Sequence, residues 1–341
     1  MSNVIRLTQP KNVNPSSISD LEVVEAIMVR LARGERAEHA GAMVTEHLNT
    51  GGKRLRARLA LSATAALNGD IDSALCWAAA VELLHNATLI HDDIQDGDKV
   101  RRGKPTTWVN HGKAQAINAG DLMLMLPFLA ISQMNSSDNV RWKLSKKLAE
   151  QAAKTVRGQV EELDIVKDQV LSKERYFRAV QGKTGGFFSL PIEGAALLAG
   201  LEEKKASDIG AAFLDLGIMF QLQDDVLDLY GDKGRKQIGA DIYEGKPSIL
   251  VFHHLNLHPE DHDYVWEILS KPREETTKEE VLVLIQLFRS SGALAAALQD
   301  IKRLKNSLLD SPSLHPYPNL RYLLQNMVEL ILSPISELMC P

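Results

Sequence analysis

The sequence predicts an all-α fold in which the chain forms a single helical bundle. Long segments repeat their apolar residues with a spacing near 3.6, as in SALCWAAAVELLHNATLIHDDI from Ser73 and KLSKKLAEQAAKTVRGQVEELDIV from Lys143. Gly and Pro are few, at 22 and 13 of 341 residues, and no segment of useful length alternates apolar and polar residues as a strand does. With 45% apolar residues the chain can bury a large core.

Several predicted helices begin where a capping residue precedes an apolar run. Ser19 and Glu22 form a capping box, in which each side chain can accept a hydrogen bond from the other residue's backbone N–H. Thr276 and Glu279 repeat this pattern later in the chain. Ser172 can cap a helix without a reciprocal acid.

The segment from about Ser73 to Ile94 is apolar nearly all round, as expected of a central helix surrounded by others. About a dozen helices are expected in all, with polar loops near residues 98–112 and 231–245. No internal repeat or low-complexity linker divides the chain. We therefore expect a flexible tail over residues 1–15 and one domain over residues 16–341.

Charge and composition exclude several classes of partner. The formal net charge of -5 gives no general attraction to nucleic acid or anionic lipid. Cys76 and Cys340 lie far apart, which argues against a zinc site and a disulfide framework. The N-terminus lacks the apolar core of a signal peptide, and the longest apolar run, LMLMLPFLAI from Leu122, is too short to span a bilayer. We expect a soluble, cytoplasmic protein without stable membrane insertion.

Three acids stand together in DDIQD. Residues four apart share a helix face, so Asp92 and Asp96 are neighbours and Asp93 stands beside them. Acids at the C-terminal end of a helix repel one another and oppose the helix dipole. A single cluster of this kind is most simply a solvated helix end.

A second cluster with the same spacing changes that interpretation. QLQDDVLDLYGD places Asp224, Asp225 and Asp228 near the end of another apolar helix. Carboxylates without nearby Cys or His suit a hard cation, and Mg²⁺ usually binds one or two carboxylates together with substrate phosphates. The sequence therefore predicts that the two clusters face each other and hold a magnesium-bound diphosphate.

Basic residues for the remaining phosphate charge occur in GGKRLR, KVRRGKPT, QGKTGG and GRKQIGADIYEGKPS. Each basic residue alone is most simply a solvated surface charge, but Gly pairs at 51–52 and 185–186 would let the backbone approach a ligand closely. The candidates are Lys53, Arg54, Arg56, Arg101, Arg102, Lys183, Lys236 and Lys246, with Thr184 beside them.

In this order and spacing the motifs resemble the trans-type isoprenyl diphosphate synthases, or polyprenyl synthetases. The resemblance runs from about Gly51 to Ser248 and includes GGKRLR, His85 seven residues before Asp92, DDIQD with RRGKPT, GQVEELD, KTGG and GIMFQLQDDVLDLYGD with GADIYEGK. It implies a helical bundle of the isoprenoid synthase type with a central cavity, usually a homodimer, that joins an allylic diphosphate head-to-tail to isopentenyl diphosphate. Where the family often has Thr, Ser248 retains the hydroxyl. The short DDIQD spacing argues against farnesyl synthases of the DDxxxxD type.

The resemblance implies a role for each matching residue. Magnesium bound by Asp92, Asp93, Asp96, Asp224, Asp225 and Asp228 would bridge to the allylic diphosphate, which Arg101, Lys183, Lys236 and Lys246 would contact. Lys53, Arg56, His85 and Arg102 would hold isopentenyl diphosphate, and Thr184 and Gln221 would lie near the reacting carbon. The residues expected to act most directly in catalysis are Asp92, Asp93, Asp96, Lys183, Thr184, Gln221 and Asp224. Taken alone, His85 is most simply a core histidine and Gln221 a packing amide.

Product length should depend on the helix that carries Asp92, because the product tail extends along it. Ala87 and Thr88 are small, with Leu84 deeper, whereas bulky aromatics at the positions of Ala87 and Thr88 stop growth near farnesyl in the family. The floor candidates on a facing apolar helix are Met123, Met125, Leu126 and Phe128. We favour geranylgeranyl diphosphate, with farnesyl or longer products as alternatives.

Two other functions use similar residues. A class I terpene cyclase also binds magnesium through an acidic cluster, but it needs no second basic site and usually carries a different second metal motif. A noncatalytic partner subunit would be expected to have lost acids from one cluster, whereas both are complete here. A head-to-head synthase is disfavoured by the same features as the cyclase.

Overall fold

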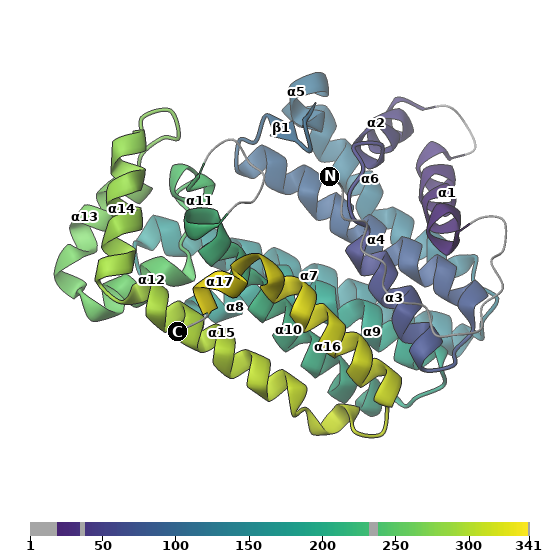
Figure 1. Ribbon diagram of the computed structural model, residues 1–341. Helices are drawn as coiled ribbons and strands as arrows, with labels where there is room; N and C mark the ends of the chain where they lie inside the picture. Colours follow the sequence, from purple (N-terminus) through teal and green to yellow (C-terminus); the bar gives the residue numbers. More distant parts are fainter. Residues whose placement is uncertain (1–18, 35–37, 232–237, 340–341) are drawn as a thin grey trace. The chain divides into compact units, whose positions relative to one another are not determined.

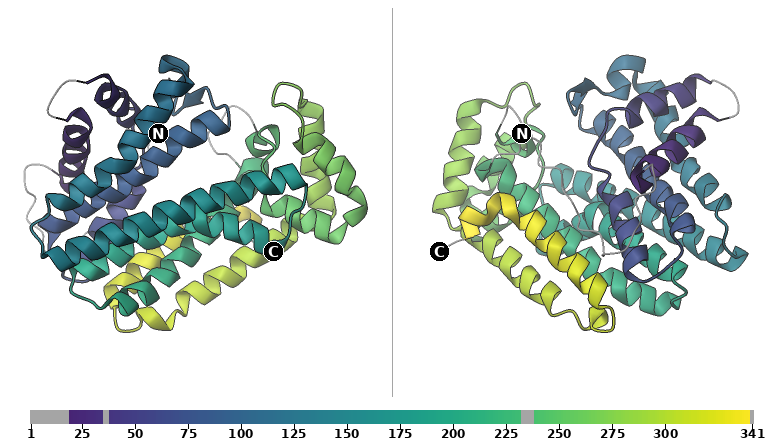
Figure 2. Two further views of the ribbon diagram at one scale, coloured as in Figure 1. Left: turned by 180° about the vertical axis from the view of Figure 1, so that it is seen from behind. Right: turned by 45° about the vertical axis from the view of Figure 1, so that its right-hand side comes forward.

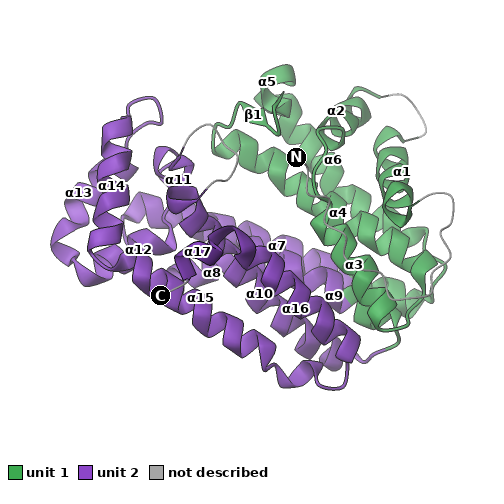
Figure 3. Ribbon diagram, viewed as in Figure 1, with its two compact units in different colours: residues 1–145, 194–200 green, residues 146–193, 201–341 purple. Residues whose placement is uncertain are grey.

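The computed structural model describes residues 19–34, 38–231 and 238–339, and these are almost entirely helical (Figure 1). This confirms the predicted all-α class. The predicted tail over residues 1–15 and the candidate Lys236 lie outside the described residues. The chain forms two compact units, unit 1 with residues 1–145 and 194–200 and unit 2 with residues 146–193 and 201–341 (Figure 3). The single domain over residues 16–341 stays a prediction.

Unit 1 is built around the long helix α4, which packs side by side with α6 (Figures 1 and 2). The side chains of Trp77 and Leu83 on α4 are fully buried, as predicted for a central helix. The elements of unit 1 are α1 (Asp20–Arg33), α2 (His39–Leu48), α3 (Leu55–Ala66), α4 (Ile71–Gln95), β1 (Val100–Arg101), β2 (Lys104–Pro105), α5 (Thr107–His111) and α6 (Lys113–Ser132).

Unit 2 is built around α10, which packs against a π-helix, α15 and α16. A Cβ on Gly217 of α10 would lie 2.7 Å from the Cα of Gly185, so the close packing of α10 against the π-helix needs glycine. Its elements are α8 (Lys173–Val180), the π-helix (Gln181–Gly185), α10 (Glu203–Tyr230), α11 (Ala240–Tyr243), α12 (Ile249–Leu257), α13 (His262–Leu269), α14 (Lys278–Ser290), α15 (Ala293–Leu309), α16 (Pro318–Leu332) and α17 (Ser336–Met339). Helices α7 (Asp138–Asp168) and α9 (Gly186–Leu198) contain residues of both units.

The predicted helix starts are largely confirmed. The Ser19–Glu22 capping box is present, and the Ser172 side chain accepts from the backbone of Arg175. The helix start predicted at Thr276 was wrong by one residue, because the capping box forms between Thr277 and Glu280. In this register Glu280 also pairs with Lys271, and the preceding Thr276 is buried.

The predicted loops contain more regular structure than expected. Residues 98–112 form the β1–β2 hairpin and α5, and residues 240–243 form α11. Such single-turn elements raise the number of α-helices in the described residues to seventeen, above the predicted dozen. Their length is too short for a periodic pattern to show.

Two helices in the described part of the chain are long and apolar enough to cross a membrane by length and composition alone. They are α4 and α6, whose most apolar windows are 72% and 44% buried within the protein. Helices α14 and α15 would make a third such segment if taken together. The sequence-based expectation considered only the uninterrupted run from Leu122, and so did not count α4 and α6 as long enough to cross a membrane.

Candidate functional site

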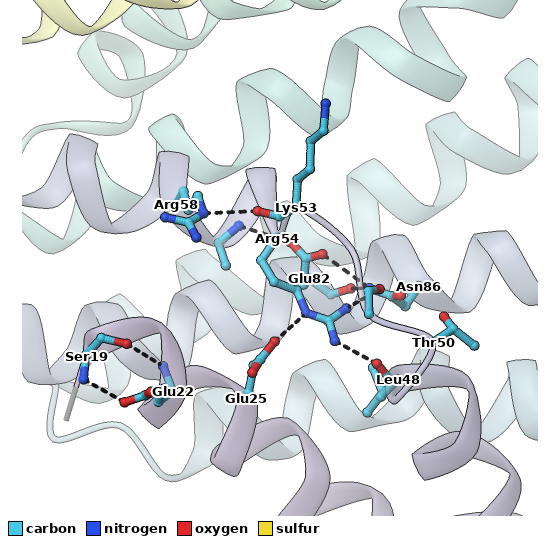
Figure 4. Close-up of polar contacts among 12 residues, drawn as sticks. Ser19, Glu22, Glu25, Leu48, Thr50, Lys53, Arg54, Arg58, Glu82 and Asn86 are labelled. Carbon is cyan, nitrogen blue, oxygen red and sulfur yellow. Dashed lines mark hydrogen bonds and ion pairs between the residues drawn. The ribbon is translucent and has the colours of Figure 1, made fainter. Parts of the chain in front are cut away.

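The basic segment GGKRLR forms the loop before α3 and the first turn of that helix (Figure 4). Gly51 and Gly52 have φ of +85° and +136°, which residues with a side chain rarely adopt. A Cβ on Gly52 would also lie 2.7 Å from Cζ of Arg102. The glycine pair therefore lets the Arg102 guanidinium approach the backbone closely, and the predicted close approach to a ligand stays a prediction.

Arg102 reaches this loop from the tip of the hairpin. Arg101 pairs with Lys104, so Arg102 and Gly103 form a two-residue turn with φ of +54° and +77°. Nη1 of Arg102 donates to the carbonyl oxygen of Gly51 and lies 3.5 Å from Oγ1 of Thr50. The structure thus places Arg102, one of the residues predicted to bind isopentenyl diphosphate, against the GGKRLR segment. That segment carries two others, Lys53 and Arg56.

Arg56 and His85 lie within electrostatic range of the same arginine. Burial lowers the pKa of the Arg56 guanidinium, and the Arg102 charge lowers it further against an opposing effect of Glu82. Burial holds the pKa of His85 well below its ordinary value, and Arg56 and Arg102 add to that shift. His85 is therefore neutral at pH 7. Lys53 is exposed, so unit 1 presents clustered positive charge that an anionic ligand would relieve.

Arg54 was grouped with these basic residues from the sequence, but it points into the protein. The residue is 5% exposed. Its Nε lies 3.0 Å from Oε1 of Glu25, and its Nη2 donates to the carbonyl oxygen of Leu48 at 2.7 Å. Arg54 is thus a structural residue and does not present its charge to a ligand.

The first acidic cluster lies at the C-terminal end of α4, where its three acids have different surroundings. Asp92 and Asp96 are half-buried, and Asp96 is the C-cap residue of the helix. Asp93 is 1% exposed, and its Oδ1 accepts from Nε and Nη2 of Arg101 at 2.7 Å and 2.6 Å. Burial raises the pKa of Asp93, and Arg101 opposes that shift. Asp93 and Arg101 therefore bind each other in this structure, and their predicted contacts with magnesium and the allylic diphosphate stay predictions.

The second cluster, on α10 of unit 2, repeats this division. Asp224 is half-buried, whereas Asp225 and Asp228 are each 3% exposed. Both carboxylate oxygens of Asp225 accept from protein donors, Oδ2 from the Tyr176 hydroxyl and the Ile249 N–H, each at 2.7 Å, and Oδ1 from Gln221 at 2.8 Å. Burial raises the pKa of Asp225 to about 6.

Asp228 accepts a hydrogen bond from the backbone N–H of Asp241 at 3.1 Å. Of the three acids, Asp224 is therefore the most accessible to a metal ion. The prediction that the two clusters face each other stays a prediction.

The π-helix carries the KTG motif and presents Lys183 and Thr184. Short π-helical turns are frequent at functional sites. The carbonyl oxygen of Gly182 accepts from Gln151 and Thr155 of α7 at 3.0 Å and 3.2 Å, which fixes the turn. Thr184 donates to Oε1 of Gln221 at 2.9 Å, so the structure joins the two residues predicted near the reacting carbon.

Both described lysines of the predicted allylic diphosphate site are close to acids. Nζ of Lys183 lies 3.0 Å from Oε1 of Glu162, and Nζ of Lys246 lies 2.7 Å from Oε2 of Glu244. Each acid therefore fixes the position of one ammonium group and balances its charge. Ser248, which retains the hydroxyl where the family often has Thr, caps α12 by accepting from the backbone N–H of Val251.

The carboxylates suit magnesium, although they do not form a closed cage. Within the described ranges, no group of three or more His, Cys, Asp or Glu side chains is gathered closely enough to hold a metal ion. Magnesium commonly takes one or two carboxylates and completes its octahedron with water and substrate phosphate. Asp92, Asp96 and Asp224 fit that use, because they are partly accessible oxygen donors.

The predicted chain-length residues belong to the α4–α6 packing of unit 1. Ala87 and Met123 are fully buried and Leu84 is 2% exposed. Thr88 is half-buried, and its hydroxyl donates to the carbonyl oxygen of His85. Of the further floor candidates, Leu126 is buried, but Met125 is 57% exposed and cannot close a pocket against α4, because it lies on the opposite face of α6.

Several residues that shape these sites were missed from the sequence. Glu25 accepts from Arg54, and Glu82 accepts from the backbone N–H of Ala57 at the start of α3. The hydroxyl of Tyr176 donates to Asp225 of the second acidic cluster. Tyr176 is 49 positions from its partner Asp225, so no local pattern reveals the contact. For Glu82, a buried acid within the apolar run AAAVELLHN is a signal that could have indicated a buried partner.

Comparisons with known proteins identify the family to which the chain is similar. Residues 37–285 match the polyprenyl synthetase family. A short chain isoprenyl diphosphate synthase from Methanocaldococcus jannaschii is 36% identical over 242 residues, covering 70% of this chain and 73% of the relative. A geranylgeranyl pyrophosphate synthase from Geoglobus acetivorans is 32% identical over 232 residues, covering 67% and 72%.

Relatives with a longer product also match. An octaprenyl diphosphate synthase from Haemophilus influenzae is 33% identical over 208 residues, covering 60% of this chain and 61% of the relative. Among solved structures, a polyprenyl synthase from Caulobacter crescentus CB15, complexed with calcium and isoprenyl diphosphate, superposes with a TM-score of 0.79 at 28% identity. That match covers 92% of this chain and 94% of the other.

Proposed function

The chain belongs to the polyprenyl synthetase family, and we propose that it joins isopentenyl diphosphate head-to-tail to an allylic diphosphate, with geranylgeranyl diphosphate as its product. The observation that carries this proposal is the presence of two complete acidic clusters together with a separate basic site. Each cluster has one partly accessible leading acid, Asp92 or Asp224. A reaction between two diphosphates needs a binding site for each.

The chain's own residues would bind and orient the substrates. The allylic diphosphate would be held by Lys183 and Lys246. The diphosphate group of isopentenyl diphosphate would be held by Lys53, Arg56 and Arg102. Charge-assisted hydrogen bonds to two separate anions would fix the distance between the reacting carbons. Arg101 would act through its contact with Asp93.

Magnesium bound at the acidic clusters would stabilise, as a Lewis acid, the negative charge on the departing diphosphate. The allylic carbon–oxygen bond breaks and the pyrophosphate leaves with the electron pair. The double bond of isopentenyl diphosphate then attacks the carbocation, and loss of a proton to the released pyrophosphate forms the new double bond. Apolar walls such as Ala87 and Leu84 would exclude water from the cation.

Small side chains along α4 support a product longer than farnesyl. Ala79, Ala80 and Ala87 are fully buried, and their short side chains would obstruct a growing product less than aromatic residues at the same positions. Each further isoprene unit buries five carbons, which favours elongation by about 4 kcal/mol until a side chain blocks it. Met123 is the proposed floor because it is fully buried on α6.

We also propose that the protein acts in the cytoplasm as a homodimer. Trp142, Val156, Val160 and Leu163 lie on one face of α7 and are 68%, 62%, 50% and 47% exposed. An apolar stripe of this length on one helix is typical of an interface with another chain. The two cysteines have no paired spacing, which fits a reducing compartment.

The test is a product assay with purified protein, magnesium, labelled isopentenyl diphosphate and each of dimethylallyl, geranyl and farnesyl diphosphate. A twenty-carbon product is expected, and Ala87→Phe should shorten it. If the unsubstituted protein forms a product of another length, the proposed floor at Met123 is wrong but the proposed reaction stands. If no primer is extended while an allylic diphosphate still binds with magnesium, the proposal fails and a terpene cyclase or a noncatalytic subunit is favoured.

A further inference from the structure

One buried guanidinium links three segments of unit 1 (Figure 4). Nε of Arg54 contacts Glu25 of α1 at 3.0 Å, Nη2 donates to the Leu48 carbonyl oxygen at 2.7 Å, and Nη1 donates to the Gly51 carbonyl oxygen at 3.3 Å. The side chain of Arg54 is 4% exposed, whereas that of Glu25 is 45% exposed. Arg54 thus joins α1, the end of α2 and the basic loop.

These contacts hold a backbone conformation that is unfavourable in itself. Arg54 has φ 48° and ψ 43°, in the left-handed region, immediately before α3 begins. For a residue with a side chain this region costs about 1 kcal/mol, and it persists where surrounding contacts fix it. The turn directs Arg54 inwards, whereas Lys53 next to it extends away from the Glu25 contact (Figure 4).

The same loop contacts a predicted substrate ligand. The carbonyl oxygen of Gly51 accepts from both Arg54 and Arg102. A shift of this carbonyl would therefore move Arg102 relative to Lys53.

On the other side of the loop, Oε2 of the buried Glu82 accepts from the backbone N–H of Ala57 at 3.1 Å. The first turn of α3 is thereby fixed to α4. The loop is thus held at both ends.

We propose that Arg54, held by Glu25, is a positioning residue that sets the loop so that Lys53, Arg56 and Arg102 reach one diphosphate together. This inference rests on the proposed function, because it assigns that diphosphate to isopentenyl diphosphate. It also gives a role to α1, which precedes the family-matched residues 37–285.

The experiment compares Glu25→Gln, Arg54→Lys and the double variant with the unsubstituted protein. Gln keeps the shape of Glu25 but not its charge, and Lys cannot reach all three acceptors of Arg54. Glu22→Gln is the matched control, because Glu22 lies one turn away on α1 and contacts Ser19 instead of the loop. For each protein the assay measures kcat, KM for isopentenyl diphosphate and for geranyl diphosphate, and thermal unfolding.

Glu25→Gln is expected to raise KM for isopentenyl diphosphate about fivefold, and Arg54→Lys about tenfold, with KM for geranyl diphosphate changing less than about twofold. The double variant should have the same KM for isopentenyl diphosphate as Arg54→Lys, because both substitutions disrupt the same Arg54–Glu25 contact. Equal changes in both KM values, or multiplying effects in the double variant, would overturn the inference.

Two further outcomes separate this inference from the proposed function. If the unsubstituted protein does not condense the substrates, the proposed function fails, and the inference fails with it. If it condenses them and Glu25→Gln behaves like Glu22→Gln, only the positioning role fails. Glu25→Gln keeps the test decisive if Arg54→Lys does not fold, since Glu25 is partly exposed.

Discussion

The basic loop before α3 and the acidic end of α4 belong to the same unit, but the protein stabilises them differently. In the loop, the guanidinium groups of Arg54 and Arg102 are bound to backbone carbonyl oxygens. At the end of α4, Asp93 is bound to Arg101 and is buried, whereas Asp92 and Asp96 are half-buried. The two arginines are therefore held by the protein itself, whereas Asp92 and Asp96 keep part of their carboxylate surface accessible.

The second acidic cluster shows that this division is not confined to one helix. Asp225, like Asp93, is buried next to a partly accessible acid. Its partners are neutral donors, from Tyr176, Gln221 and Ile249, instead of an arginine. In both clusters the second acid is buried among protein donors, and the first, which we propose as a metal ligand, is half-buried.

The largest expected effect is on catalysis by variants of the leading acids. Asp92→Asn and Asp224→Asn should each lower the condensation rate about a thousandfold, because metal stabilisation of the leaving group is worth several kcal/mol. Asp72→Asn on α4 and Asp208→Asn on α10 are matched controls at exposed positions. Steady-state rates with saturating substrates measure the effect, and a loss below tenfold at either leading acid would contradict the metal assignment.

A smaller effect should distinguish the two buried acids. Asp93→Asn leaves Arg101 without its anionic partner and should lower the free energy of unfolding by about 3 kcal/mol at pH 7. Asp225→Asn should cost less, because burial already raises the pKa of Asp225 to about 6 and its partners are neutral. Urea unfolding measures both values. Equal losses would show that the arginine makes no difference.

Acid should lower the free energy of unfolding through His47, a buried histidine near Arg101 and Arg102. Burial lowers the pKa of His47 from 6.5 to about 3, with Arg101 and Arg102 adding to the shift. Below pH 6.5 the unfolded chain binds a proton that the folded protein does not, so the free energy of unfolding falls as the pH falls. Between pH 6.5 and pH 5 this contribution is about 2 kcal/mol.

The comparison of the unsubstituted protein with His47→Gln isolates that contribution, since the other histidines affect both proteins equally. Urea unfolding at several pH values should show the smaller pH dependence in the variant. If the free energy of unfolding changes equally with pH in both proteins, the pKa of His47 is the same in the folded and unfolded states, and this prediction is wrong.

The smallest expected effect concerns one neutral donor of the second cluster. Tyr176→Phe removes a hydrogen bond to Asp225 but leaves the Ile249 N–H in place, and should cost about 1 kcal/mol of stability. It should also raise the pKa of Asp225, because that hydrogen bond favours the ionised form. Tyr264→Phe, at a position 43% exposed, is the control. Equal unfolding midpoints for the two variants would contradict this role.

Much of the fold follows from local sequence. The apolar periodicity of α4 and the capping residues Ser19 and Ser172 act within a few positions, so the chain itself reveals them. Thr276 and Thr277 offer two equivalent starts for α14. Burial of Thr276 decides between them, and burial is a tertiary property.

The division of labour within each site could not be predicted in the same way. Lys53, Arg54 and Arg56 carry the same charge in one short segment. Arg54 points inwards because it contacts Glu25, 29 positions away, together with the carbonyl oxygens of Leu48 and Gly51. Likewise Asp92 and Asp93 are identical neighbours until the hairpin brings Arg101 to one of them. Motif spacing identifies the segment, whereas long-range packing determines which side chain remains accessible.

The most direct test of the difference between the acidic and basic sites is calorimetric binding of geranyl diphosphate and of isopentenyl diphosphate, each with magnesium and with EDTA. Removing magnesium should weaken geranyl diphosphate binding at least about a hundredfold, because the acidic clusters of its proposed site repel the anion without a cation and Lys183 and Lys246 are each paired with an acid. Isopentenyl diphosphate should keep its Kd within about threefold, because its site consists of lysine and arginine side chains. Equal dependence of both ligands on magnesium, or independence of both, would contradict this account.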